Sequence, residues 1–378
     1  MINYMWVKNF RSLADVSVNF EPLTVLVGLN GSGKSNLVDA LYFVSDALRN
    51  GLDTAIVKRH SMSAIRRWSA KGRPYNVEIG LDIETDTLWG EYSFTLGSER
   101  RGEYRVKREK CLVGKPGERR TEMWFETNNG KWIKHSQEFN IPISRTGLVL
   151  PLVAGVEPYN EIYDFLTSMS FYNIFPNILG EPQRPANPYP LEKHGENLAS
   201  VLRELKRDKS TFAPNLETAL RNVIDGVNSY QVSQVGGYLI TRLHHDAPDG
   251  NRAPLFELAQ ESDGTLRMLG ILAALYQDPP RTLIALEEPE LTIHPGAMSI
   301  LWEEIQNAAS RSQILVTTHS PDMLDMCTAE QLRIVEKLKG ITYIGPIEKE
   351  QQQIIQERLF APGQLLQAQG LRRAQDEE

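Results

Sequence analysis

The feature that most constrains this chain is a glycine-rich motif between a strand-like run and a helical pattern. Residues 28 to 35 read Gly-Leu-Asn-Gly-Ser-Gly-Lys-Ser and directly follow the apolar run Leu23–Val27. In this order, the backbone N–H groups of the loop form a nest for phosphate, and the following helix directs its positive dipole end toward the anion. The motif therefore predicts a nucleoside triphosphate site of the P-loop type in an α/β fold.

The motif assigns a role to each of its positions. Lys34 is expected to reach the β- and γ-phosphates, and the hydroxyl of Ser35 is expected to bind Mg²⁺. A chance glycine turn is the alternative interpretation, and the flanking strand and helix argue against it. The residues expected to contact the nucleotide are Asn30, Gly31, Ser32, Gly33, Lys34, Ser35 and Asn36.

Composition narrows the class of protein. The chain has 378 residues, of which 41% are hydrophobic and 24% charged, as is usual for globular proteins. No apolar run approaches the roughly 20 residues that span a bilayer, the N-terminus lacks a signal-peptide pattern, and the only cysteines are Cys111 and Cys327. We therefore expect a reduced, cytoplasmic protein with no membrane partner. The net charge of −7 argues against nucleic-acid binding through bulk charge and leaves a local basic patch open.

The N-terminal half of the predicted fold covers residues 1–150. It contains strand-like alternation before the P-loop and an antiparallel meander over residues 76–113. Residues 151–229 have a mostly helical pattern and are interpreted as a helical insertion.

The C-terminal half covers residues 230–350, where short apolar runs are each followed by a polar turn and a helical pattern. Such runs are typical of parallel strands covered on both faces. Residues 351–378 are assigned to a polar tail, and the stretch 364–378 is expected to fray. The predicted fold is an α/β P-loop NTPase with a mostly parallel sheet, an antiparallel β-subdomain and a helical insertion.

Two carboxylates end a buried strand in the C-terminal half, in the run Thr-Leu-Ile-Ala-Leu-Glu-Glu-Pro-Glu at residues 282 to 290. A Walker B strand needs one acid for the Mg²⁺ shell and a second to orient or deprotonate the attacking water. We assign Glu287 to the metal and Glu288 to the water. A solvated acidic turn is the alternative, which the P-loop elsewhere in the chain disfavours.

A histidine follows the next apolar run, in Ile-Leu-Val-Thr-Thr-His-Ser-Pro at residues 314 to 321. A neutral His319 at the end of a strand can bind a γ-phosphate or the attacking water. Alternatively it belongs to a helix start with Ser320 as N-cap and Pro321 at the first position, and both interpretations can hold together. The expected catalytic residues are thus Lys34, Glu288 and His319.

A second anion site is suggested by Glu-Ser-Asp-Gly-Thr at residues 261 to 265, just before a helical run. Ser262 and Gly264 at a free helix N-terminus suit a phosphate. A plain capped helix, with Ser262 or Asp263 as the cap, is the alternative.

These motifs and their order resemble those of the SMC-like branch of ABC-type ATPases. More narrowly, it is similar to the AAA-family ATPases of prokaryotes that resemble the ATPase half of overcoming-lysogenization-defect (OLD) nucleases. The resemblance covers the chain from Met1 to about Gly345. It rests on Asn9–Leu13, Gly28–Asn36, Ser262–Arg267, Glu287–Glu290 with His294 and Pro295, and Thr317–Pro321.

The resemblance implies an enzyme that hydrolyses ATP slowly with Mg²⁺ as a homodimer, with larger oligomers left open. Two ATP molecules would lie between the subunits, so that Ser262 and Gly264 of one subunit contact the γ-phosphate held by Lys34 of the other. It also implies that Arg11 lies near the nucleotide. Glu287 departs from the commoner Walker B aspartate, and the signature Ser-Asp-Gly-Thr departs from the Ser-Gly-Gly-Gln of transporter ATPases. No glutamine loop is identified.

For the role of the ATPase, the resemblance favours a switch in DNA maintenance or anti-phage defence. OLD nucleases carry a C-terminal TOPRIM nuclease domain, whereas no Asp-x-Asp pair follows His319 here. We therefore expect a separate effector or nuclease partner. A transporter ATPase subunit is the first alternative, disfavoured by the signature and by the long interval from Ser35 to Ser262. A non-hydrolysing nucleotide sensor or scaffold is the second, disfavoured by Glu288 and His319.

DNA is a candidate partner, and the best contact surface in the sequence is the basic segment 58–73, which contains one Trp and no acid. Interleaved cationic and aromatic residues suit a phosphate backbone or a stacked base. A second cluster over residues 100–110 is interrupted by Glu103 and Glu109. A solvated loop and strand face is the slightly favoured alternative for these segments.

Overall fold

The short apolar runs of the sequence form neighbouring parallel strands in this computed structural model, which describes the chain except for residues 69–74, 98–102, 140, 208–212, 248–253 and 376–378. The parallel group comprises β3 (Leu23–Val27), β9 (Ser170–Tyr172), β13 (Leu283–Glu287), β14 (Gln313–Thr318) and β15 (Leu332–Leu338). β14 pairs with β3 on one side and with β13 on the other. β3, β13 and β14 are buried along almost their whole length, as expected for parallel strands covered on both faces.

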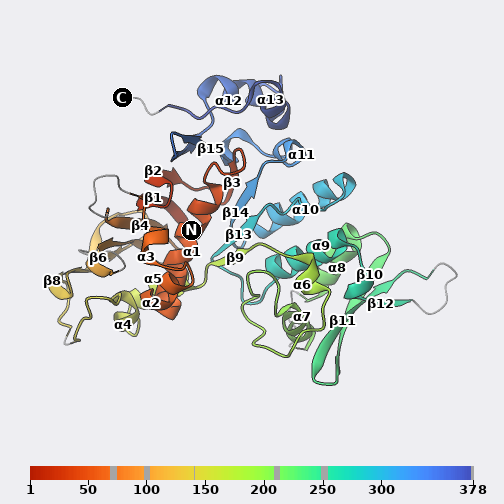
Figure 1. Cartoon of the computed structure of the whole chain (residues 1–378), viewed down its shortest axis with the longest axis horizontal. Helices are drawn as coiled ribbons and strands as arrows, with labels where there is room; N and C mark the ends of the chain where they lie inside the picture. The colour runs from red at the N-terminus through yellow and green to blue at the C-terminus, as the bar shows by residue number, and fades with distance from the viewer. Residues whose placement is uncertain (69–74, 98–102, 140, 208–212, 248–253, 376–378) are drawn as a thin grey trace.

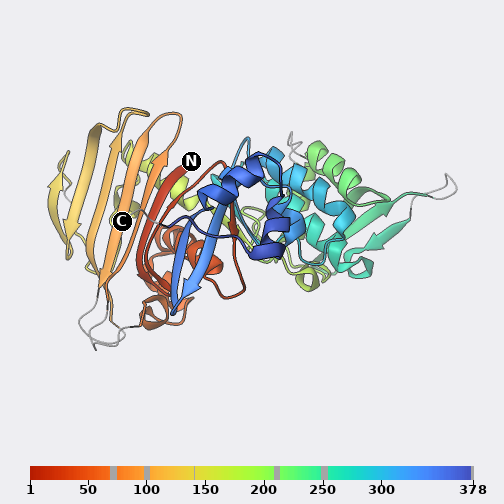
Figure 2. The same ribbon diagram turned by 90° about the horizontal axis from the view of Figure 1, so that it is seen from above.

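The antiparallel strands continue the same sheet (Figures 1 and 2). They are β1 (Ile2–Phe10), β2 (Leu13–Asn19), β4 (Val77–Glu84), β5 (Trp89–Gly97), β6 (Arg105–Gly114), β7 (Thr121–Asn128), β8 (Lys131–His135) and β16 (Ile341–Pro346). The order in this 13-stranded sheet is β8-β7-β6-β5-β4-β1-β2-β16-β15-β3-β14-β13-β9. The predicted α/β fold is confirmed, but the sheet is mixed rather than mostly parallel, because the antiparallel strands belong to the same sheet as the parallel group.

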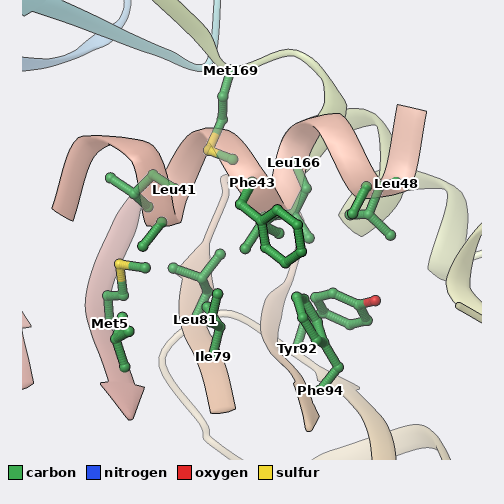
Figure 3. Close-up of a cluster of buried hydrophobic side chains, with 14 of the residues drawn as sticks. Met5, Leu41, Phe43, Leu48, Ile79, Leu81, Tyr92, Phe94, Leu166 and Met169 are labelled. Atoms are coloured by element: carbon green, nitrogen blue, oxygen red, sulfur yellow. The ribbon is translucent and has the colours of Figure 1, made fainter. Parts of the chain in front are cut away.

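Helix α1 (Lys34–Asn50) packs across the antiparallel strands. Figure 3 shows Leu41, Phe43 and Leu48 of this helix above Leu81 and Phe94 of the sheet. The rings of Phe43 and Phe94 lie 6.2 Å apart. This burial fixes the orientation of the helix that begins at the P-loop. Short helices surround it: α2 (Leu52–Val57), α3 (Met62–Ile65), α4 (Leu150–Val153) and α5 (Tyr159–Thr167).

Helices of a second lobe cover the opposite face of the parallel strands (Figure 1). Ile284 and Val316 of the strands belong to one buried cluster with Leu269 and Leu301. The helices of this lobe are α6 (Pro176–Leu179), α7 (Leu198–Arg207), α8 (Ala213–Val223), α9 (Asp263–Leu275) and α10 (Pro295–Ala308). Beside them lies a small antiparallel sheet of β10 (Val227–Val235), β11 (Tyr238–His245) and β12 (Leu255–Glu257).

The C-terminal segment is more ordered than its polar sequence indicates. It forms α12 (Lys349–Gln356) and α13 (Pro362–Gln369), and α13 packs on α11 (Pro321–Leu324). Leu365 is buried, Gly363 N–H donates to the Asp325 carboxylate, and Ile347 forms a β-bridge with Arg373. The expected fraying of residues 364–378 is wrong for this part, because a few apolar side chains are enough to dock a short polar helix. In the described ranges, no helix is both long and apolar enough to cross a membrane.

Candidate functional site

The P-loop joins the end of β3 to the start of α1. Gly33 has φ of 115°, and a Cβ atom there would lie 2.2 Å from Thr342 Oγ1, so only glycine fits. The ammonium of Lys34 lies over the loop and donates to the carbonyls of Gly28 (2.7 Å) and Leu29 (3.3 Å). Burial lowers the pKa of Lys34, and the charges of Glu288 and Glu290 oppose that shift. These acidic neighbours place the Walker B segment close to Lys34.

A chain of hydrogen bonds supports the loop from residues distant in sequence. Thr342 Oγ1 donates to Ser32 O at 2.7 Å and lies 2.7 Å from Ser12 Oγ, which accepts from Asn36 Nδ2 at 2.7 Å. Thr342 reaches this place because β16 pairs with β2 at Leu13. Asn36 was predicted to contact the nucleotide, and in the structure its side chain belongs to the hydrogen-bond chain that supports the loop. The sequence analysis did not predict that Ser12 and Thr342 support the P-loop. Only Ser12 lies in a motif that it used, Asn9–Leu13.

Three strands end side by side at the P-loop edge. Val27 pairs with Thr318, and Thr317 pairs with Glu287, so the residues that follow each strand share this edge. Glu288 has φ of 45° and its N–H donates to Thr317 O at 3.0 Å. The Nδ1 atom of His319 lies 3.4 Å from Glu288 Oε1. The structure thus brings Glu288, which follows β13, next to His319, which follows β14.

The expected metal ligands are oxygen donors of the kind that Mg²⁺ prefers. Glu287 ends β13, with its side chain 15% exposed, and Ser35 lies in the first turn of α1. Among the described residues, no group of three or more His, Cys, Asp or Glu could hold a metal alone. A serine hydroxyl and a glutamate carboxylate are oxygen donors that suit a Mg²⁺ ion bound by one or two protein oxygens together with nucleotide phosphates.

Glu290 is a buried acid that the sequence analysis quoted without assigning it a role. It is 7% exposed, and Thr318 Oγ1 donates to its Oε1 atom. Its Oε2 atom is buried and has no hydrogen-bond partner among the described residues. Burial raises the pKa of Glu290, against the hydrogen bonds that lower it. Its place as the third acid of the Glu-Glu-Pro-Glu run is the sequence feature that could have pointed to this residue.

Arg267 on α9 is a second residue whose role the sequence analysis missed. It is 4% exposed, and its guanidinium donates to the backbone carbonyl of Glu288 at 3.0 Å. Burial lowers its pKa, while the charges of Glu290 and Glu288 raise it. The helix that begins at the signature is therefore tied to the segment that carries Glu288.

The signature residues Ser262 and Gly264 line a different hollow, a cavity of about 530 Å³ bordered by α8, α9, the turn at Thr292 and the start of α10. Ser262 is the N-cap of α9, and its Oγ accepts from Thr265 N–H at 3.1 Å. The capping interpretation of Ser262 therefore holds, and the helix N-terminus still faces the cavity.

Arg11 lies in the tight turn between β1 and β2. Its guanidinium pairs with Asp39 of α1 at 2.8 Å and donates to Asn36 Oδ1 at 3.5 Å. It therefore lies beside the first turns of the helix that follows the P-loop, with its side chain 35% exposed.

Part of the basic segment 58–73 is buried or paired within the fold, while Trp68 is 79% exposed. Arg59 is buried and pairs with Asp39 and Asp46, while Lys58 pairs with Asp46 at 2.8 Å. Arg66 is also buried. The favoured alternative, a solvated face, is thus wrong for these two buried arginines. Because they are buried, they are also not available to contact DNA. Residues 69–73 lie outside the described residues.

The second basic cluster is similarly paired. Arg108 lies 2.9 Å from Glu126, and Lys110 lies 2.9 Å from Glu91. Glu109 between them is fully buried. Residues 100–102 of this cluster lie outside the described residues.

Three curated relatives are similar to the chain in sequence. The OLD nuclease of Escherichia phage P2 is 22% identical over 355 residues, which cover 84% of this chain and 56% of that protein. The "Retron Vc95 probable ATPase" of Vibrio cholerae is 22% identical over 83% of this chain and 69% of that protein. The DNA double-strand break repair Rad50 ATPase of Halobacterium salinarum is 39% identical over 103 residues. The chain spans only 12% of this Rad50 and just over half of the OLD nuclease.

Solved structures share the fold. A SmcHead bound to the C-winged helix domain of ScpA aligns with a TM-score of 0.56 at 17% identity, covering 93% of this chain and 98% of that chain. An Smc head domain with an extended coiled coil, bound to the C-terminal domain of ScpA derived from Pyrococcus furiosus, aligns with a TM-score of 0.52 at 15% identity, covering 95% and 99%.

The family model that matches this chain is described as "AAA domain, putative AbiEii toxin, Type IV TA system", and its match over residues 23–325 includes the P-loop, the signature, both Walker B acids and His319. This match over residues 23–325 shows that the chain belongs to that AAA domain family, and its fold is that of SMC heads.

Proposed function

We propose that the chain hydrolyses ATP as a dimer in which two copies enclose two MgATP molecules. In each site, Lys34 would bind the β- and γ-phosphates, while Ser35 and Glu287 would hold Mg²⁺. Glu288 would orient and deprotonate the attacking water, and His319, 3.4 Å from its carboxylate, would hold the γ-phosphate or that water. Asn30, Gly31, Ser32 and Gly33 would contribute the phosphate nest.

The observation that supports the proposed dimer is the location of the signature residues. Ser262 and Gly264 border a cavity formed by α8, α9 and α10, whereas Lys34 and Glu288 lie where β3 and β13 end. In the proposed dimer, a phosphate held by Lys34 would meet the signature of the second copy. Charge-stabilising groups that a partner donates in phosphoryl transfer are worth on the order of 10³–10⁵ in rate, so an isolated copy is expected to hydrolyse ATP slowly.

We further propose that closure and opening of this dimer act as a switch in DNA maintenance or anti-phage defence. The similarity to an OLD nuclease, a retron ATPase and a DNA-repair ATPase supports this role. We expect an effector protein to receive the signal, as Smc heads bind ScpA in the similar structures. DNA remains a candidate ligand.

The test is the oligomeric state of Glu288→Gln, which keeps the size of the side chain and removes the proposed base. Light scattering after size exclusion should give a dimer with MgATP and a monomer without nucleotide. Lys34→Ala is the control and should stay monomeric under both conditions. A Glu288→Gln protein that binds MgATP and remains monomeric would contradict the dimer.

A further inference from the structure

A lysine lies beside the carboxylate that we assign to the metal. The Nζ atom of Lys193 is 3.5 Å from Glu287 Oε1. The lysine side chain is 36% exposed and the glutamate side chain 15% exposed, so the pair lies at the mouth of the site. At this separation the contact is an ion pair at the outer limit of hydrogen bonding, and it can be displaced.

The backbone around Lys193 is fixed at the same edge of the sheet. Because Tyr172 of β9 pairs with Leu286 of β13, Asn173 follows β9 beside Glu287. The N–H of Asn173 donates to Lys193 O at 2.9 Å. The next residue, His194, has its ring stacked on that of Phe175 at 4.5 Å between centroids. These contacts hold the base of the lysine while its side chain extends toward Glu287.

We propose that Lys193 competes with Mg²⁺ for Glu287. The ammonium neutralises this carboxylate when no metal is bound and moves aside when MgATP enters. The inference rests on the proposed function, since it takes Glu287 as a metal ligand. An ammonium is a compact charge on a flexible stem, whereas Mg²⁺ combines a double charge with affinity for carboxylate and phosphate oxygens. The divalent ion therefore displaces the lysine once phosphates are present.

The released ammonium has a place to go. Lys193 lines a cavity of about 420 Å³ between α1 and the segment 190–196, and Glu192 and Glu196 line it as well. The ring of Tyr42 on α1 lies 5.7 Å from the Lys193 Nζ atom and borders the same cavity. The ammonium thus has room to leave Glu287 inside a cavity that carries both acidic and basic side chains, the basic ones being Arg49 and Lys58, without refolding the segment that carries it.

The experiment measures how much Mg²⁺ the full-length chain needs to bind a non-hydrolysable ATP analogue, by calorimetry across a Mg²⁺ series. Lys193→Met should lower the half-saturating Mg²⁺ concentration about three- to fivefold, as expected for removing one partly exposed competing charge. Binding of the analogue in EDTA should stay unchanged. The matched control is Lys58→Met, because Lys58 lines the same cavity but pairs with Asp46.

Four results would overturn the inference. An unchanged Mg²⁺ midpoint in Lys193→Met would show no competition, and an equal shift in Lys58→Met would show a general effect of charge. Weaker binding of the analogue in EDTA would make Lys193 a phosphate ligand instead. A wild-type chain that binds no analogue at any Mg²⁺ concentration would overturn the proposed function and this inference together, whereas normal binding with an unshifted midpoint would overturn this inference alone.

Discussion

The guanidinium of Arg267 donates to the backbone carbonyl of Glu288 at 3.0 Å, and so links the signature helix to the proposed catalytic acid. Glu288 has φ of 45°, a conformation that non-glycine residues adopt at a cost. Its N–H is held by Thr317 and its carbonyl by Arg267. The position of this carboxylate is therefore set by contacts from β14 and α9.

Arg267→Met should lower kcat by about ten- to a hundredfold and leave KM nearly unchanged. The reason is that a buried charge-assisted hydrogen bond is worth roughly 1.5–3 kcal/mol, and here its loss displaces Glu288 rather than the nucleotide. Steady-state kinetics would measure both constants, with Arg267→Lys as the variant that keeps the charge. A rise in KM with unchanged kcat would contradict this role.

Thr342→Val should weaken nucleotide binding and lower the free energy of unfolding by ~1–3 kcal/mol. The substitution keeps the shape of the side chain and removes the hydroxyl that donates to Ser32 O, so it leaves a buried acceptor unpaired. Thr342→Ser retains the hydroxyl and should bind nucleotide nearly as the wild type does. Denaturant unfolding and calorimetry would measure the two effects. Equal nucleotide affinity in Thr342→Val and wild type would contradict the supporting role of Thr342.

Glu109 should make stability depend on pH. Burial raises its pKa to about 7, although Val149 N–H, Leu150 N–H and the Tyr92 hydroxyl donate to it. The folded chain therefore retains a proton that the unfolded chain loses near the ordinary glutamate pKa of 4.5. The free energy of unfolding should thus fall by ~3 kcal/mol as pH rises between these two values and level off above the higher one.

Glu109→Gln isolates this contribution, because an amide does not titrate. Denaturant unfolding at a series of pH values should give a shallower slope for the variant than for the wild type across this window. Identical slopes in the two proteins would show that Glu109 does not titrate in the way described.

The local sequence was sufficient to predict features that lie within one strand and the turn or helix that follows it. The P-loop between β3 and α1 and the acids after β13 follow from a short stretch of residues each. Thr342 could not be found in this way, because it contacts the P-loop only through the pairing of β16 with β2. Likewise, Arg59 is part of a basic run in the sequence, and only the fold places it opposite Asp39 and Asp46.

The tail shows the same limit in another form. A polar composition hides Leu365, whose burial against the body of the chain orders α13. Lys193 also lacked a sequence signal, since its pairing with Glu287 depends on β9 lying next to β13. Contacts between segments distant along the chain are thus what the sequence alone left unresolved.

The most direct test of the central claim, a site shared between two copies, is to mix two inactive variants. Lys34→Ala removes the phosphate ligand, and Ser262→Asp keeps an N-cap while placing a negative charge where the signature would meet phosphate. Each variant alone should have little ATPase activity. An equal mixture should recover up to about half of wild-type turnover, because Lys34→Ala copies do not dimerise with each other and each mixed dimer has one intact site. A mixture no more active than the two variants measured separately would contradict the shared site.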